Sequence, residues 1–307
     1  MGFVNTKMID PKGIDVSRIA NGYADIPGQT VRYVQSSHLR ATNLNNQGKN
    51  RNYPLSTIVK AISLSQTYDT IIVLPGHIEV VSAANGLDVN KVGLFIHGAG
   101  GETTRPQVKV GTLTTATMRI SAADVSMDNF DLLTDIDALA QVLSIISAGA
   151  KLSNFACVDS ATKQALVHLE LAVGANFTRI SGMRMDAQSA GGVSAIKISG
   201  ACDHPQILDC DLGGDYSTAN IDVTAAATRV RIGNNLCPNL NAANISIKCA
   251  AVASSGQVFR NFCSLITGVL DSSVAITMGA GCLWYLNENY GEDTVQQTGK
   301  VLGVVAT

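Results

Sequence analysis

Short runs of alternating apolar and polar residues recur along the chain, and each run ends in a cluster of small residues. The plainest example is Ala195-Ile196-Lys197-Ile198, which is followed by Ser199-Gly200-Ala201. The runs are spaced 23 to 29 residues apart, counted from the last apolar residue of each: Val73, Ile96, Ile120, Ile146, Leu171, Ile198, Val223, Ile247 and Ile276. A repeat of roughly 20 to 50 residues is typical of a solenoid, in which each repeat buries its apolar face on the next. The repeat therefore predicts one elongated domain.

A second short strand is predicted nine to eleven residues after most of these positions. These second strands are centred on Phe130, Phe155, Ile180, Ile207, Ile232, Val258 and Leu286. Asn, Asp or Gly residues lie beside them, as expected at tight turns. Because the apolar period is two and the runs are short, the elements are strands and not helices. The Leu-x-Leu-x-x-Asn pattern of a leucine-rich repeat does not occur. The sequence predicts a parallel β-helix of about nine coils over residues 67–290.

Residues 1–53 show no sustained period and are basic. They contain seven Lys and Arg against three Asp, a net charge of +4, which leaves −6 for the remainder of a chain whose total is −2. Such a segment buries too little apolar surface to offset the entropy of its own ordering. We therefore expect an extended anchoring arm that orders on a partner. Its candidate partner-binding residues are Lys7, Lys12, Arg18, Arg32, Arg40, Lys49 and Arg51.

A short amphipathic helix is predicted within residues 54–66. The apolar residues Leu55, Ile58, Val59 and Ile62 fall at helical spacing after Pro54, and Ser56 is the expected N-cap. An open end of a β-helix would otherwise pair with another chain. The helix is expected to cap that end.

The residues after this helix carry a resemblance to a known family. A strand that ends in Pro75-Gly76 is followed one repeat later by a strand that ends in the Gly-rich turn Gly98–Gly101. This order resembles the opening of the right-handed, pectate-lyase-like β-helix superfamily. Residues 203–216 and the Ser, Ala and Gly corners look like β-helix proteins of bacteriophage virions. The resemblance covers about residues 54–290 and implies a right-handed solenoid, whereas its motifs say little about activity.

Residues 291–307 form a tail that contains an apolar segment, Lys300–Val305, without a following repeat. Two arrangements are open for this strand: it folds back as a lid, or it pairs with a neighbouring subunit.

The densest acidic group is a candidate for carbohydrate chemistry. It contains Asp186, Asp203, Asp209, Asp211 and Asp215. Glycosidases use paired carboxylates as acid and nucleophile or base, and the lyases of this superfamily use acidic residues to hold calcium. Asp side chains also bind exposed backbone at turns, and only Trp284 and Tyr216 are available as aromatic contacts for a sugar. We expect a structural role for the group, with carbohydrate processing and a cation site as alternatives.

Cysteine and histidine spacing predicts neither a metal site nor a cofactor. The five histidines have no ligand spacing, and no Cys-x-x-Cys pair occurs. The seven cysteines are expected to be reduced thiols inside the coil, with disulfides between repeats or subunits as the alternative; they are Cys157, Cys202, Cys210, Cys237, Cys249, Cys263 and Cys282.

Together these features predict a non-enzymatic structural protein of a bacteriophage virion. We expect a capsid decoration or cement protein, anchored by its arm to the major capsid protein or another virion protein, and a homo-oligomer, with a trimer favoured. A tail fibre or tailspike component and a polysaccharide-degrading lyase or hydrolase are the alternatives. The net charge argues against nucleic-acid binding. Without a signal peptide or an apolar run of about 20 residues, neither secretion nor a membrane location is expected.

Overall fold

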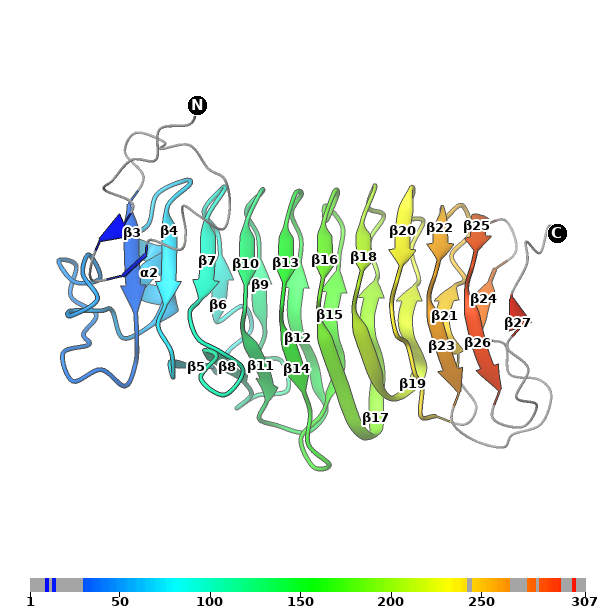
Figure 1. The fold of residues 1–307 in the computed structure, drawn as a ribbon, viewed down its shortest axis with the longest axis horizontal. Helices are drawn as coiled ribbons and strands as arrows, with labels where there is room; N and C mark the ends of the chain where they lie inside the picture. Colours follow the sequence, from blue (N-terminus) through cyan, green and yellow to red (C-terminus); the bar gives the residue numbers. More distant parts are fainter. Residues whose placement is uncertain are drawn as a thin grey trace.

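The chain folds as a right-handed parallel β-helix, as predicted, with about eight turns where about nine coils were expected. The computed structural model describes residues 9–10, 13–14, 30–241, 245–265, 275–279, 282–293 and 300–301. Its strands succeed one another along the long axis from β3 at one end to β25 at the other (Figure 1). Among the described residues, no helix is long and apolar enough to cross a membrane.

One strand of each turn lies in a ten-stranded parallel sheet. The sheet is built from β3 (Val31–Val34), β4 (Thr70–Val73), β7 (Phe95–Gly98), β10 (Ser126–Asp128), β13 (Lys151–Ser153), β16 (Arg179–Ser181), β18 (Gln206–Leu208), β20 (Val230–Gly233), β22 (Ser255–Phe259) and β25 (Leu283–Asn287). Its inward side chains form one apolar row from Ile71 to Leu286, in which Ile180, Ile207, Ile232 and Val258 stand at the predicted centres.

The rest of each turn lies in a twelve-stranded sheet that bends around the core. Early turns contribute two strands each: β5 (Ile78–Val81) and β6 (Leu87–Val89), β8 (Gln107–Val110) and β9 (Met118–Ile120), β11 (Asp131–Thr134) and β12 (Leu139–Ile145), β14 (Ala156–Val158) and β15 (Ala165–Leu171). The long strands β17 (Arg184–Ile198) and β19 (Asp211–Val223) run through both positions, and β21 (Ile245–Cys249) and β24 (Ile276–Met278) complete the sheet.

The repeat positions that the sequence predicted as equivalent do not all lie in the same sheet. Val73 and Ile96 lie in the ten-stranded sheet, whereas Ile120 and its successors lie in or beside the twelve-stranded sheet. Both sheets have the same alternating pattern, so spacing alone matched a strand of one to a strand of the other. The predicted strand centres Phe130 and Phe155 are also wrong. They occupy the corner after β10 and β13, where their buried rings pack with centroids 5.8 Å apart and planes tilted by 36°.

That corner is the tightest turn of the fold. In seven successive turns of the solenoid, one residue of this corner has a positive φ. These residues are Asn129, Asn154, Gly182, Asp209, Asn234, Arg260 and Glu288. The residue after it points inward, and the stack runs Phe130, Phe155, Met183, Cys210, Asn235, Asn261 and Asn289. The three Asn at its end form a buried ladder in which each carboxamide Nδ2 donates to the Oδ1 of the next at 2.9 Å. The ladder satisfies polar groups that would otherwise be unpaired in the core.

The N-terminal end of the solenoid is closed by α2 (Ile58–Leu64) and by strand β3. The N-cap is Thr57, whose side chain accepts a hydrogen bond from the Lys60 N–H, and not the predicted Ser56. Val59 is exposed, and Ala61 takes its place on the buried face. Because β3 pairs in parallel with β4, part of the predicted arm of residues 1–53 is a strand of the solenoid.

Five short strands form two small sheets outside the main ones. At the C-terminal end, β23 (Phe262–Leu265), β26 (Tyr290–Asp293) and β27 (Lys300–Val301) form a sheet in which β27 is antiparallel to β26. The start of the predicted tail strand therefore folds back onto its own chain, and residues 302–307 lie outside the described part. Near the start of the chain, β1 (Ile9–Asp10) and β2 (Gly13–Ile14) pair antiparallel.

Candidate functional site

The seven basic residues predicted to bind a partner have different environments. Lys7, Lys12 and Arg18 lie outside the described residues. Arg32 is buried in β3, in register with Ile71, and its guanidinium donates to the carbonyl of Leu64 at the end of α2. A cation at a helix C-terminus is favourable. The inclusion of Arg32 in a partner-binding surface is thus corrected: its side chain joins the end cap to the solenoid.

The other three basic residues are exposed at the N-terminal end, in the segment between β3 and α2. The Arg40 guanidinium lies 5.2 Å from the centre of the Tyr53 ring, and its Nη1 donates to the Tyr53 hydroxyl at 3.1 Å. Lys49 and Arg51 are exposed nearby in sequence. The structure therefore leaves Arg40, Lys49 and Arg51 accessible.

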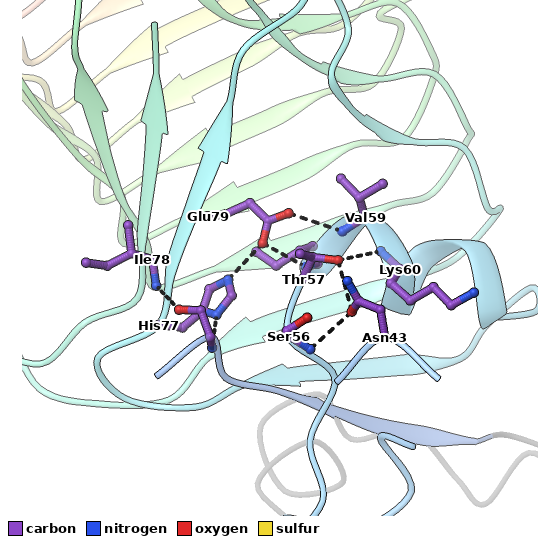
Figure 2. Close-up of polar contacts among 10 residues, drawn as sticks. Asn43, Ser56, Thr57, Val59, Lys60, His77, Ile78 and Glu79 are labelled. Atoms are coloured by element: carbon purple, nitrogen blue, oxygen red, sulfur yellow. Dashed lines mark hydrogen bonds and ion pairs between the residues drawn. The ribbon is translucent and has the colours of Figure 1, made fainter. Parts of the chain in front are cut away.

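A buried carboxylate holds α2 against the solenoid (Figure 2). Glu79 of β5 accepts hydrogen bonds from the backbone N–H of Ile58 at 2.9 Å and of Val59 at 3.4 Å. It also contacts Nε2 of His77 at 3.0 Å. Negative charge at the first turn of a helix satisfies unpaired N–H groups and complements the helix dipole. Glu79 therefore acts as a second cap, supplied from another element.

His77 joins this cap to the segment that follows β3. Its Nδ1 accepts the backbone N–H of Ser36 at 2.9 Å, and the Ser36 hydroxyl accepts the N–H of Ile78 at 3.0 Å. With Nδ1 as an acceptor, the hydrogen-bond pattern assigns the ring proton to Nε2, which donates to Glu79. Asn43 accepts from the Ser56 N–H and the Thr57 hydroxyl on the other side of the helix start (Figure 2).

The acidic group is dispersed along the corners of the solenoid. Asp203 forms an ion pair with Arg229 and accepts from Thr228, and Asp209 accepts from Asn234 at 3.1 Å. Hydrogen bonding to Arg229 lowers the pKa of Asp203, an effect that outweighs its slight desolvation. Asp211 begins β19, and Asp215 lies within it. The side chain of Asp186 lies outside the described part, and the predicted aromatic contact Tyr216 is fully buried.

The outer face of the ten-stranded sheet contains a histidine–carboxylate pair. His97 Nδ1 lies 3.0 Å from Asp128 Oδ2, while Ser153 and Asn154 donate to Asp128 Oδ1 at 2.7 and 2.8 Å. Burial alone would raise the pKa of Asp128, but the hydrogen bonds outweigh it and hold that pKa below its ordinary value. Asp128 therefore joins three successive turns.

A second histidine–carboxylate pair is buried. His168 Nε2 lies 3.0 Å from Asp159 Oδ2, and both side chains are inaccessible to solvent. The imidazole edge packs on the Tyr216 ring at a centroid distance of 6.0 Å. Burial opposes ionisation of Asp159, yet the contact with His168 keeps its pKa below the ordinary value. The pair joins the residue after β14 to β15 inside the coil. Within the described residues, no group of three His, Cys, Asp or Glu side chains is arranged to hold a metal ion.

All seven cysteines are free thiols in the structure, and six of them are buried. Burial raises the pKa of Cys202 to about 11 and that of Cys210 to about 12. The Cys237 thiol hydrogen-bonds to Cys263, and that contact together with burial raises its pKa strongly. Thiols with raised pKa values are poor nucleophiles. These cysteines therefore serve as core side chains.

The outer face of the ten-stranded sheet also carries a surface that the sequence did not reveal. Its outward row contains Lys151, Arg179, Gln206, Arg231, Gln257 and Tyr285 in register. At the C-terminal end of this row is a groove of about 690 Å³. Its walls include His204, Arg229, Arg231, Gln257, Trp284 and Tyr285. Only the register of the strands brings these residues together, since they span 82 positions from 204 to 285.

Comparisons with known proteins identify the fold and no activity. No protein-family model and no curated protein sequence matches the chain. A rhamnogalacturonan lyase superposes with a TM-score of 0.54 at 11% identity, over 84% of this chain and 87% of that one. The pectate lyase Pel9A gives 0.52 at 12% identity, over 87% and 78%. ORF18 of Geobacillus virus E2 gives only 0.44 at 11% identity, over 84% and 60%. The chain thus has the right-handed parallel β-helix fold of the pectate-lyase-like proteins.

Proposed function

We propose that the protein is a non-enzymatic structural component of a bacteriophage virion, namely a capsid decoration or cement protein. This proposal rests on the bonds that surface carboxylates form with side chains of neighbouring turns. Asp88, Asp128, Asp203 and Asp209 each bind a side chain of a neighbouring turn. Carboxylates in such pairs link the neighbouring turns of the rod. A fold shared with lyases does not by itself bring their activity.

The proposed partner is the major capsid protein or another virion protein, bound through the N-terminal segment. The segment from Thr30 to Leu64 is tied to the solenoid by Arg32, Glu79 and His77. Residues that precede it are thus attached to a fixed point on the rod. The exposed Arg40, Lys49 and Arg51 supply positive charge at the same end. An acidic particle surface would complement that charge.

The protein is also proposed to self-associate, with a trimer favoured. Leu236 and Phe262 are paired on successive turns and are 40% and 41% exposed, and Leu240, in the same part of the chain as Leu236, is 40% exposed. Exposed apolar residues that adjoin one another mark association surfaces. The mass of the particle-free protein by light scattering tests this part of the proposal.

The attachment experiment must leave β3 intact. A variant that lacks residues 1–28 retains Val31–Val34 and the strand pairing with β4, whereas removal of residues 1–50 would delete that strand. We expect the shorter deletion to keep the β-helix circular dichroism spectrum and to lose attachment to particles. Attachment of the full chain is expected to weaken with salt, because exposed charges are screened over ~8–10 Å at physiological ionic strength.

A second variant tests the exposed basic residues separately from residues 1–28. Replacing Arg40, Lys49 and Arg51 by Gln removes the exposed charge and leaves residues 1–28 in place. Removal of residues 302–307 serves as the matched control and is expected to leave attachment unchanged. If the deletion and the triple variant both bind particles as well as the full chain, the anchor lies elsewhere. A tail fibre or tailspike role then becomes the better proposal.

A further inference from the structure

We infer that the contact between His77 and Ser36 opens on mild acidification and releases the start of the segment that follows β3. The contact joins that segment to the turn between β4 and β5, at the N-terminal end of the rod. This inference goes beyond the proposed structural role and does not rest on it, because the isolated protein is sufficient for the test.

The hydrogen bonds of His77 require a neutral ring. Its side chain is fully buried. Nδ1 lies 2.9 Å from the Ser36 backbone nitrogen and accepts its N–H, so Nδ1 bears a lone pair. Nε2 lies 3.0 Å from Glu79 Oε2 and bears the proton. An imidazolium has an N–H on both nitrogens, so a second proton would make Nδ1 a donor that faces the Ser36 donor. The closed contact therefore excludes the protonated ring.

Glu79 stabilises the protonated ring once Ser36 has moved. Its carboxylate is 4% exposed and caps α2 through the N–H groups of Ile58 and Val59. In the protonated state the bond from His77 Nε2 to Glu79 becomes an ion pair, and a charge-assisted bond in a buried site is stronger than a neutral one. Acid therefore breaks the contact with Ser36 and leaves Glu79 in place at the start of the helix.

The other charged side chains of the elements around His77 are exposed or bound elsewhere. Arg32 of β3 binds the Leu64 carbonyl, at the opposite end of α2 from Glu79. Figure 2 shows Lys60 of α2 extending away from the His77 ring. The remaining ionisable side chains of α2, of β8 and of the segment between β3 and α2 are at least partly exposed: Lys60, Lys109, His38, Arg40, Lys49 and Arg51. Exposed charges interact weakly across solvent, so Glu79 dominates the charge environment of His77.

The bond to His77 is the most shielded of the bonds that hold Ser36. The bond from the Ile78 N–H to the Ser36 hydroxyl and the bond from the Gln35 side chain to the turn are each 3.0 Å long and lie at the surface. On one side of Ser36, β3 stays paired with β4, and on the other side residues 42 and 43 are bonded to residues 54–57. The opening is thus confined to residues 36–41.

Hydrogen exchange measures this opening directly. Opening takes up one proton on His77, so each unit of pH lost favours it by up to about tenfold in the range where imidazoles titrate. Exchange of backbone amides in the full chain is compared at about pH 7.5 and about pH 5, as protection relative to the unfolded chain, which removes the intrinsic effect of pH on exchange. We expect protection of the Ser36 amide to fall about tenfold or more at the lower pH, and protection in β13 and β16 to change by less than about twofold.

Two substitutions at His77 separate its two bonds. His77→Asn places a carboxamide oxygen where Nδ1 stands, so it accepts the Ser36 N–H without titrating, and protection at Ser36 is expected to be the same at both pH values. His77→Gln reaches Glu79 but not Ser36, and low protection at Ser36 is expected at both pH values. The matched control is His97→Gln, which removes the histidine paired with Asp128 and is expected to keep the response of the unchanged protein.

Every other result contradicts the inference. Equal protection of Ser36 at the two pH values would show that the contact does not respond to acid. A fall that persists in His77→Asn would assign the response to another group. An equal fall in β13 and β16 would identify general acid unfolding in place of a local opening. Particle attachment does not enter these measurements, and the deletion of residues 1–28 tests it separately.

Discussion

At the scale of single residues, the solenoid depends on polar side chains that are shared between turns. Asn261 is fully buried, and its carboxamide contacts Asn235 on one side and Asn289 on the other. Asp128 plays the same part on the outer face, where it receives bonds from His97, Ser153 and Asn154. Each such residue satisfies several partners, so its removal leaves more than one polar group unpaired.

We expect Asn261→Ala to lower the free energy of unfolding by about 3 kcal/mol, since an unpaired buried polar group costs about 1–3 kcal/mol. The substitution strips Asn235 of its Oδ1 acceptor and the Ile232 carbonyl of its donor. Urea denaturation measures the effect. Asn287→Ala, an exposed site on β25, is the control and should change stability by less than about 0.5 kcal/mol. A similar loss in both variants would count against the buried ladder.

The contribution of Asp128 to folding stability depends on pH, and the direction of the change can be predicted. Its pKa in the folded protein is lower than in the unfolded chain, so the unfolded state binds the proton first as the pH falls. Its contribution to stability is complete above the ordinary aspartate pKa and disappears as the pH falls through the lowered value. Asp128→Asn should therefore destabilise the protein at about pH 6, with a difference that shrinks below about pH 4. Urea midpoints across this range test the expectation, and Glu102→Gln, an exposed control, should show no such trend.

At the scale of elements, the short helix α2 relies on contacts from outside itself. A helix of seven residues is not stable alone. Thr57 caps it locally, Glu79 caps it from β5, and Arg32 binds its last carbonyl from β3. The helix, the segment after β3 and the first turn are therefore expected to order as one unit.

We expect Glu79→Ala to loosen this unit without unfolding the rest of the rod. Loss of the carboxylate leaves the Ile58 N–H and the His77 Nε2–H unpaired, at a cost of about 2–4 kcal/mol in local stability. Hydrogen exchange should accelerate at Ser36 and Ile58 and remain slow in β13 and β16. Uniformly faster exchange along the rod would show that the unit is not separate. Glu102→Ala, which removes an exposed carboxylate, serves as the control.

At the scale of the whole molecule, the protein is a rod in which Asp88, Asp128, Asp203 and Asp209 bind side chains of neighbouring turns and whose N-terminal end is closed by α2 and β3. We expect purified protein to leave bacterial capsule and lipopolysaccharide intact over long incubation, measured by the release of reducing or unsaturated sugar ends. Cleavage that disappears in Asp209→Asn or Asp211→Asn would establish the polysaccharide-degrading alternative. A known lyase of the same fold is the positive control for the assay.

The sequence by itself determined the class of fold, a solenoid in which successive repeats stack along one direction. Apolar alternation with a period of two and a spacing near 25 residues identify strands that stack. The predicted positions Ile180, Ile207, Ile232 and Val258 all lie within strands of one sheet and in register with one another. Such local patterns persist in the fold because every turn buries the same kind of face.

Only the tertiary structure decided which residues meet. Val73 and Ile120 have the same local pattern and lie in different sheets, because the lengths of the turns between strands vary and pattern alone does not assign a strand to its sheet. In the sequence, Arg32 is one basic residue among several, but the pairing of β3 with β4 buries it against α2. The groove at Arg231 and Tyr285 likewise depends on register, which brings together residues more than fifty positions apart. Contacts between distant parts of the chain arise where successive turns of the solenoid stack. The register of that stacking depends on all the strands and turns of each repeat.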